Sequence, residues 1–360
     1  MISVAMATYN GAEFLREQLE TIAAQTLLPT ELVITDDASS DDTVMIIRRF
    51  AEASPFPVRL YQNPVRLGFR ANFMKAIVKC SSQLIALCDQ DDVWSPRKLQ
   101  TMLTTFSDPE VLLSFHEAWL IDATGARLNL AMILPLENKS SPLSLWPLRN
   151  PYGFSMMFRR NLLIVSDLWV KSADNLKTDI PMAHDQWFFF LASTLGTIEY
   201  IPEPLAGYRQ HGSNTYGIER PPVNLRGRIV RWLNVRSNEY KSFAVAAKVR
   251  ASNLEDGLSC MDADWQIRAL QAITRYHNLS RHCGWRAEVY SGGLFHRLDY
   301  WIRLVSDGAY GNSTRWTFGR KAAMVDLLCL IAPRWLLNMI SRFEPQGLQN
   351  HTFTPTTMTE

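Results

Sequence analysis

Hydrophobic and polar positions follow two alternating periods over roughly the first hundred residues. Short apolar runs rich in β-branched residues predict buried strands, and after each polar turn apolar residues at helical spacing predict a helix. The predicted strands are 2–8, 31–35, 58–61 and 84–88, and the predicted helices are 14–23, 44–50, 71–78 and a segment that begins at Ser95-Pro96. Four such repeats predict an α/β fold with a parallel, doubly wound sheet.

Beyond these repeats the pattern changes twice. From about residue 111 the strand and helix patterns stop alternating, and we expect an α+β half that completes the same domain. After Pro221-Pro222 the pattern is mostly helical, and the last residues have the composition of a flexible tail. The predicted organisation is a first domain at 1–220, a mainly helical C-terminal region at 221–345 and a flexible tail at 346–360.

Composition narrows the class of protein. The 360 residues are 47% hydrophobic, enough for one large domain with an appendage or for two modest domains. Lysine and arginine number 37 against 35 acids, so the formal charge of +2 gives no overall attraction for nucleic acid. The 5 cysteines are scattered without a C-x-x-C pair, a pattern that suggests neither a disulfide framework nor a zinc knuckle and fits a reducing cytoplasm.

The sequence predicts no membrane crossing. The N-terminus lacks the features of a secretion signal, and the apolar stretch 322–332 is about half the length of a spanning helix and contains Asp326. In the helical region Arg228, Arg231 and Arg236 alternate with apolar side chains, and Trp335 opens a further apolar segment. These helices either lie on an anionic membrane surface at the inner face or pack against the protein or a second subunit. Both interpretations stay open.

Acidic side chains follow two of the predicted strands. Asp89, Asp91 and Asp92 come directly after the strand at 84–88, and Asp36-Asp37 follows the strand at 31–35. Carboxylates this close repel one another unless a cation is present, and oxygen ligands suit Mg²⁺ or Mn²⁺. The alternative is a solvated turn before a helix. Because ligands of doubly wound sheets lie beyond the carboxyl ends of the strands, we expect these turns to meet in one crevice.

A second polar cluster comes later in the chain. Asp185 precedes a very apolar helix, where an acid either serves the helix N-terminus or, partly shielded from water, acts as a general base. Tyr208 to His211 brings a cation and an imidazole together after a predicted strand, and histidine can ligate a metal or meet a phosphate.

These segments together resemble the family-2 glycosyltransferases with the GT-A fold, most closely the bacterial rhamnosyltransferase-like members. The matching stretches, in family order over about the first 215 residues, are 4–11 (VAMATYNG), 36–39 (DDAS), 88–94 (CDQDDVW), 184–185 (HD) and 208–211 (YRQH). The resemblance implies a Rossmann-like, mostly parallel sheet flanked by helices. It also implies a hexosyltransferase that depends on Mn²⁺ or Mg²⁺.

The resemblance assigns roles to individual residues. Asp185 would be the catalytic base. The donor-binding residues would be Ala7, Thr8, Tyr9, Asp37, Arg66 and Asp89, the last on the ribose side. The metal ligands would be Asp91 and His211, with Asp92 left open as the alternative to Asp91. The acceptor side would hold Gly153, Phe154 and His184.

The implied reaction is a single displacement that inverts the anomeric centre, because one base is present and no second carboxylate stands out as a nucleophile. The donor would be dTDP-rhamnose or a UDP-sugar, and the acceptor a hydroxyl of a bacterial surface polysaccharide such as O-antigen, capsule or exopolysaccharide, free or lipid-linked. A sugar nucleotidyltransferase would instead carry a glycine- and arginine-rich loop at 7–11, and a dehydrogenase a G-x-G-x-x-G. An inactive glycan- or membrane-binding module would not need the full set of acids. A homo-oligomer stays open.

Overall fold

The computed structural model describes residues 1–131, 138–211, 225–311 and 316–331, with only the backbone at 225–236 and 331. The chain divides into two compact units. The first comprises Met1–Ser172, Pro181–Gln210 and Glu255–Leu270, and the second Ala173–Ile180, His211–Leu254 and Gln271–Glu360. The boundary predicted near residue 220 and the tail predicted from residue 346 lie outside the described residues.

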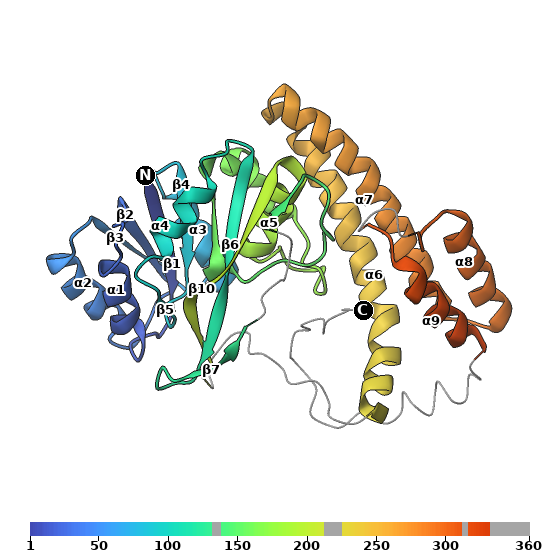
Figure 1. Ribbon diagram of the computed structural model, residues 1–360, viewed down its shortest axis with the longest axis horizontal. Helices are drawn as coiled ribbons and strands as arrows, with labels where there is room; N and C mark the ends of the chain where they lie inside the picture. Colours follow the sequence, from blue (N-terminus) through green and yellow to red (C-terminus); the bar gives the residue numbers. More distant parts are fainter. Residues whose placement is uncertain (132–137, 212–224, 312–315, 332–360) are drawn as a thin grey trace. The chain divides into compact units, whose positions relative to one another are not determined.

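The first unit begins with the predicted repeats of strand and helix (Figure 1). Its strands β1 to β4 are all parallel, in the order β3-β2-β1-β4. Side chains of β1, β2 and β4 are buried along their whole length, as expected for parallel strands covered on both faces. The bounds are β1 Ile2–Thr8, α1 Leu15–Ala23, β2 Glu31–Asp36, α2 Thr43–Ala53, β3 Val58–Gln62, α3 Phe69–Val78, β4 Leu84–Cys88 and α4 Lys98–Thr105.

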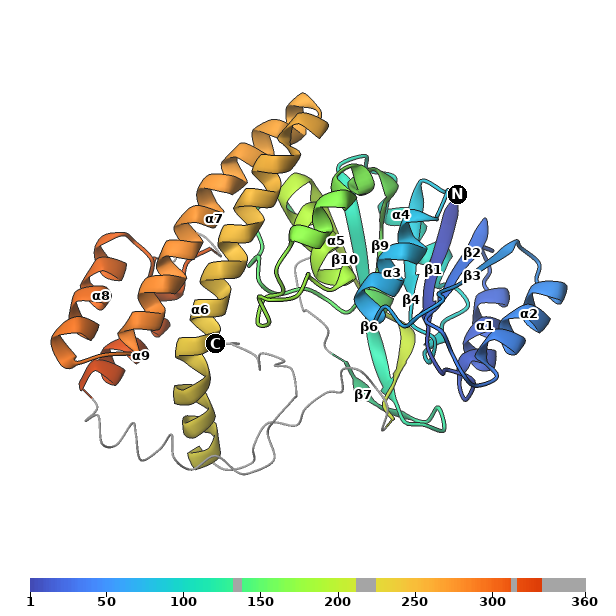
Figure 2. The ribbon, with the colours of Figure 1, turned by 180° about the vertical axis from the view of Figure 1, so that it is seen from behind.

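The helices of the repeats cover both faces of the sheet. The chain moves outward from β1 to β3 through α1 and α2, and α3 then returns it across β1 to β4. Because such connections are right-handed, the outward and the returning helices lie on opposite faces. In agreement, α1 contacts α2 and α3 contacts α5 (His184–Leu195), which can be followed in Figures 1 and 2.

The second half of the sheet is mixed, in the order β4-β9-β6-β10-β5. Strand β9 runs against both β4 and β6, so β6 and β10 point in the same direction as β1 to β4. The remaining bounds are β5 Val93–Trp94, β6 Val111–Ile121, β7 Arg127–Leu130, β8 Lys139–Ser140, β9 Met156–Arg159, a 3₁₀ segment Arg160–Lys171 and β10 Thr197–Arg209. The predicted fold class, a mostly parallel sheet flanked by helices with a mainly helical C-terminal extension, is confirmed.

Two long helices belong to both units. They are α6 (Leu225–Gly257) and α7 (Ala263–Val289), and the end of one and the beginning of the other lie in the first unit. There the guanidinium of Arg268 donates to the carbonyl oxygen of Leu195 at 2.6 Å and pairs with Glu110 at 2.7 Å. The first unit therefore includes Glu255–Leu270, a segment that lies well after the last strand of its sheet in the sequence.

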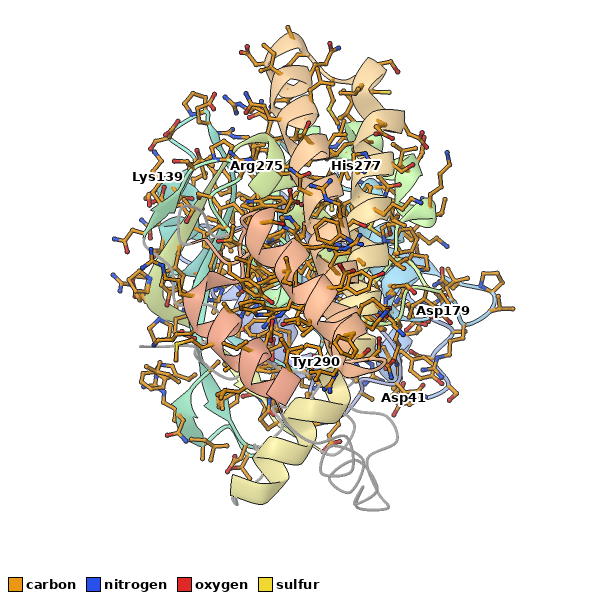
Figure 3. The ribbon with its side chains drawn as sticks, turned by 90° about the vertical axis from the view of Figure 1, so that its right-hand side faces the viewer. Asp41, Lys139, Asp179, Arg275, His277 and Tyr290 are labelled. Carbon is orange, nitrogen blue, oxygen red and sulfur yellow. The ribbon has the colours of Figure 1, made fainter. Side chains whose placement is uncertain are left out.

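The second unit is helical and is held by a buried ion pair. Arg286 at the end of α7 donates to Asp326 at 2.8 Å, and neither side chain is more than 4% exposed. Asp326 lies on α9 (Gly319–Ile331) and also accepts a hydrogen bond from Tyr290, which is labelled in Figure 3. The helix α8 (Leu294–Ser306) packs against α9 and adds Leu304 to the core.

The membrane interpretation rests mostly on residues outside this description. Within the described residues no helix combines the length and apolarity that a membrane crossing requires. The side chains of Arg228, Arg231 and Arg236 and the segment that begins at Trp335 lie outside the described part of the chain.

Candidate active site

The carboxyl ends of β1 and β2 are tied together. The hydroxyl of Thr8 donates to Asp36 at 2.9 Å, and the backbone N–H of Asp37 donates to the carbonyl oxygen of Thr8 at 2.9 Å. Ala7 is buried in β1 beside Thr35 of β2. The structure therefore brings the first predicted donor-binding residues to one edge of the sheet.

Asp37 uses its carboxylate to hold the loop after β3. Its Oδ1 accepts the backbone N–H of Leu67 at 2.7 Å and the side-chain amide of Asn63 at 2.9 Å, and its Oδ2 accepts the N–H of Gly68 at 2.8 Å. Asp37 is only 2% exposed. The residue assigned to the nucleoside thus shapes the loop that carries Arg66.

Arg66 and Tyr9 form a stacked pair at this edge. The guanidinium carbon of Arg66 lies 3.9 Å from the centre of the Tyr9 ring, within the range of a cation–π interaction. The backbone of Tyr9 is held by Gln90, a residue that the sequence interpretation did not single out. The two predicted donor contacts therefore lie side by side, next to the carboxylate turn.

The carboxylate turn, residues 89–92, connects β4 to β5. Burial, and then the charges of Asp91 and Asp185, raise the pKa of Asp89 to about 8. Asp92 is fully buried, and its Oδ1 accepts the backbone N–H of Arg209 at 3.1 Å. Asp91 is partly exposed. The turn therefore encloses one of the two candidate metal ligands, Asp92, and leaves the other accessible.

A buried lysine lies beneath the turn. The ammonium group of Lys98 donates to the carbonyl oxygen of Phe154 at 2.7 Å and lies 3.8 Å from the centre of the Trp94 ring. Burial lowers its pKa to about 7 although Asp92 and Asp89 act in the opposite direction. The sequence signal is its place on the apolar face of α4, four positions before Met102.

Asp185 stands in the first turn of α5 and makes two hydrogen bonds. Its Oδ1 accepts the N–H of Gln186 at 2.8 Å, and its Oδ2 accepts the side-chain amide of Asn150 at 3.1 Å. Burial and then the charge of Asp185 raise the pKa of Tyr152, and the same charge adds to the effects of burial and Asp91 on Asp89, so the Asp185 carboxylate lies within electrostatic range of both residues. Asp185 therefore lies where an acid favours the helix N-terminus, and its carboxylate is also fixed in one orientation.

The three predicted acceptor-side residues lie next to Asp185 and are enclosed. The His184 ring stacks on Phe73 with 3.8 Å between ring centres, and burial, then the charge of Arg70, lower its pKa to about 3. A Cβ on Gly153 would lie 2.7 Å from Nε2 of His184, so this position leaves room only for glycine. Phe154 is 1% exposed and stacks on Tyr208 at 4.8 Å. These residues shape the wall beside Asp185.

The two cationic residues predicted at the end of β10 have different surroundings: Arg209 is buried, and His211 is partly exposed. The buried guanidinium of Arg209 donates to the carbonyl oxygens of Asp91 at 2.8 Å and Ala123 at 2.9 Å, and pairs with Glu17 at 2.6 Å. The Arg209 guanidinium therefore stabilises the fold by linking three segments of the chain. His211 is partly exposed and is the last described residue before 212–224.

The donor atoms at this edge fit a hard divalent cation. Asp91 is partly exposed and its charge acts on Asp89, and carboxylate oxygens are ligands that suit Mg²⁺ and Mn²⁺. In the described part of the chain, no three His, Cys, Asp or Glu side chains are gathered closely enough to hold a metal by themselves. A cation bound through Asp91 would therefore take further ligands from its substrate or from water, as Mg²⁺ commonly does.

Comparison with known proteins finds a family match for the N-terminal part of the chain. Residues 3–164, a little under half of the chain, match the family model described as glycosyl transferase family 2. The sheet described above has the mostly parallel, helix-flanked arrangement that the resemblance implies.

Individual relatives share less than a third of their aligned residues with this chain. Rv1520, an uncharacterized protein of Mycobacterium tuberculosis, is 30% identical over 216 residues, which are 58% of this chain and 59% of that protein. RfbG of Shigella flexneri, a dTDP-rhamnosyl transferase, is 25% identical over 243 residues, 66% of this chain and 81% of its own. The solved structure of Staphylococcus aureus TarS 1–349 with UDP aligns with a TM-score of 0.47 and 15% identity, covering 86% of this chain and 93% of that one.

Proposed function

We propose that the protein is a metal-dependent, inverting glycosyltransferase that moves one sugar from a nucleoside diphosphate to a hydroxyl of a bacterial surface polysaccharide. One observation carries the proposal: the Asp185 carboxylate, fixed by Asn150, lies within electrostatic range of Asp89 in the carboxylate turn, at the sheet edge where Tyr9 and Arg66 stack. A base and a donor site then share one location. The match of residues 3–164 to the family-2 glycosyltransferase model supports this assignment.

The donor side would be formed by the loops after β1, β3 and β4. Tyr9 and Arg66 present an aromatic face and a guanidinium at the accessible edge, and Asp37 fixes the loop of Arg66 through three hydrogen bonds. In this assignment the nucleoside lies against Tyr9, and Asp89 meets the ribose.

A divalent cation would be held by Asp91, with His211 as a further ligand. We choose Asp91 over Asp92 because the Asp92 carboxylate is buried and already accepts the N–H of Arg209. The bound cation would supply positive charge to the departing diphosphate. The positive charge of the cation would also offset the repulsion between the carboxylates of Asp91 and Asp89.

Asp185 would take the proton from the acceptor hydroxyl as the hydroxyl oxygen attacks the anomeric carbon. The two hydrogen bonds to its oxygens fix the orientation of the carboxylate, and the wall of Gly153, Phe154 and His184 keeps that side of the site closed to water. Because a single displacement uses one base and no covalent intermediate, the anomeric configuration inverts.

The donor that we propose first is dTDP-rhamnose, since the relative RfbG bears the name of a dTDP-rhamnosyl transferase. The test is the release of nucleoside diphosphate from dTDP-rhamnose and a panel of UDP- and GDP-sugars, with MnCl₂ and with EDTA. Release from at least one donor that EDTA abolishes is the expected result. A metal-saturated protein that binds none of these nucleotides and releases none would contradict the proposed function.

A further inference from the structure

The side-chain amide of Gln90 forms two hydrogen bonds with the main chain of Tyr9. Its Oε1 accepts the N–H of Tyr9 at 2.9 Å, and its Nε2 donates to the carbonyl oxygen of Tyr9 at 3.1 Å. A residue within a strand likewise uses its N–H and its carbonyl oxygen to bond to the neighbouring strand. The pairing of β1 with β4 ends at Met6 and Cys88, so Gln90 connects the two segments beyond the point where the backbone ladder stops.

Gly11 provides the space that this amide occupies. A Cβ on Gly11 would lie 2.3 Å from Oε1 and 2.5 Å from Cδ of Gln90, well inside van der Waals contact. Asn10 directs the chain past the amide with a φ of 46°. Because the amide is the far end of a flexible side chain, a methyl group at Gly11 would displace the amide and leave the backbone in place.

Gln90 joins two parts of the proposed site that otherwise belong to different loops. Tyr9 carries the ring on which Arg66 stacks, whereas Gln90 lies between Asp89 and Asp91 in the carboxylate turn. Both bonds are partly shielded from water, where hydrogen bonds are stronger than in solvent. Any movement of the Gln90 amide therefore loosens the position of Tyr9 relative to the carboxylates.

We propose that Gln90 is a positioning residue for donor binding, and that Gly11 is glycine because the Gln90 amide needs its space. Gln90 sets the distance between the nucleoside side of the donor site and the turn that meets the ribose and diphosphate. This inference rests on the proposed function, since it assigns Tyr9 to the nucleoside. The inference adds one specific connection, the two hydrogen bonds between the Gln90 amide and the backbone of Tyr9, which join the loop after β1 to the carboxylate turn.

The experiment compares Gln90→Met, Gly11→Ala and the double variant with the parent. Methionine keeps the length of the side chain and removes both hydrogen bonds, and Gln100→Met on the exposed side of α4 is the matched control. Dissociation constants for dTDP, UDP and GDP with MnCl₂ are measured by calorimetry, beside melting temperatures. We expect each single variant to weaken the best nucleotide about tenfold, the equivalent of about 1.4 kcal/mol and of one or two hydrogen bonds.

The double variant is decisive. If Gly11→Ala acts by displacing the Gln90 amide, the double variant loses about tenfold and not about a hundredfold, because there is no amide left to displace. An additive loss, or variants with lower melting temperatures and unchanged dissociation constants, would overturn the inference. A parent that binds none of the three nucleotides would overturn the proposed function and this inference with it, whereas a binding parent with an equally binding Gln90→Met overturns the inference alone.

Discussion

Asn150 donates a hydrogen bond to Asp185 across 35 positions of sequence, at 3.1 Å from Nδ2 to Oδ2. The backbone N–H of Gln186 occupies the other carboxylate oxygen. Asp185 is therefore held from both sides in one orientation, as a base that must meet an incoming hydroxyl requires. A residue that only serves the N-terminus of a helix needs no such second support.

Changing Asp185 to Asn separates these two roles. The substitution keeps the shape and removes the proton acceptor, so we expect a folded protein with nearly unchanged nucleotide affinity and transfer reduced by roughly 10² to 10⁴. Loss of a helix-end charge alone costs only about 0.3 to 1 kcal/mol of stability. Asp264→Asn, in the first turn of α7, is the control for that charge effect. If the variant transfers sugar at a rate within about tenfold of the parent, a residue other than Asp185 is the base.

Changing Asn150 to Ala tests the support and leaves the base in place. The carboxylate gains freedom to rotate and loses one fixed hydrogen bond, so kcat falls by about tenfold, as expected for a bond of about 1 kcal/mol and a less ordered base. We expect the dissociation constant of the nucleotide to stay unchanged because Asn150 bonds to Asp185, which is assigned to the acceptor hydroxyl and not to the nucleotide. Single-turnover rates and calorimetry on one preparation measure both. An unchanged rate would show that Asp185 needs no support from Asn150.

Alanine at Asp91 and at Asp92 should give opposite results. Asp91 is partly exposed, so its loss leaves stability nearly unchanged and removes the effect of Mn²⁺ on nucleotide affinity. Loss of the buried Asp92 carboxylate leaves the N–H of Arg209 without its acceptor, which costs about 1 to 3 kcal/mol of stability. Urea unfolding and calorimetry with and without MnCl₂ distinguish the two. Reversed results would assign the metal to Asp92.

Acid should weaken the fold through Glu31, at the beginning of β2. Burial favours the neutral carboxyl, but hydrogen bonds from Ser81, Ser3 and Arg59 outweigh burial and lower its pKa from 4.5 to about 2. A lowered pKa stabilises the folded state above pH 4.5, and this contribution is lost as the pH falls towards 2. At about 1.4 kcal/mol for each pH unit between the two values, it is on the order of 3 kcal/mol.

The variant Glu31→Gln measures this contribution. Its free energy of unfolding, determined with urea, should fall less between pH 5 and pH 2 than that of the parent, by up to the same amount. Glu52→Gln, an exposed acid on α2, should fall in parallel with the parent. Equal pH dependence in all three proteins would contradict the assignment to Glu31.

The first half of the fold could be predicted from the sequence because β1, β2 and β4 are buried along their whole length and mostly apolar, and because the intervening helices keep their own period. The same logic placed Asp37 and Asp89 at one edge of the sheet. Strand β9 was not predicted. Its four residues, Met156–Arg159, show no alternation, and their antiparallel place between β4 and β6 depends on contacts with distant strands.

Within the candidate site, the carboxylates could be found from motifs but their partners could not. Lys98 reaches the carbonyl oxygen of Phe154 across 56 positions, and Asn150 reaches Asp185 across 35. Neither spacing leaves a local pattern. The hydrogen bonds that the Asp37 carboxylate accepts from the loop at 63–68 could not be predicted from its motif. The sequence named Asp91 as the metal ligand with Asp92 as the alternative, and gave no sign that Asp92 is the buried one of the two.

The late segment Glu255–Leu270 has a practical consequence for dissecting the protein. Through Arg268 it supplies hydrogen bonds to Leu195 and Glu110, close to the sheet that carries the site. A chain shortened at residue 220 would retain every motif and yet lack this support, leaving the Leu195 carbonyl and the Glu110 carboxylate without it. We therefore expect a chain that ends at residue 220 to be less stable than the complete first unit, and during translation this support can form only after residue 270 has left the ribosome.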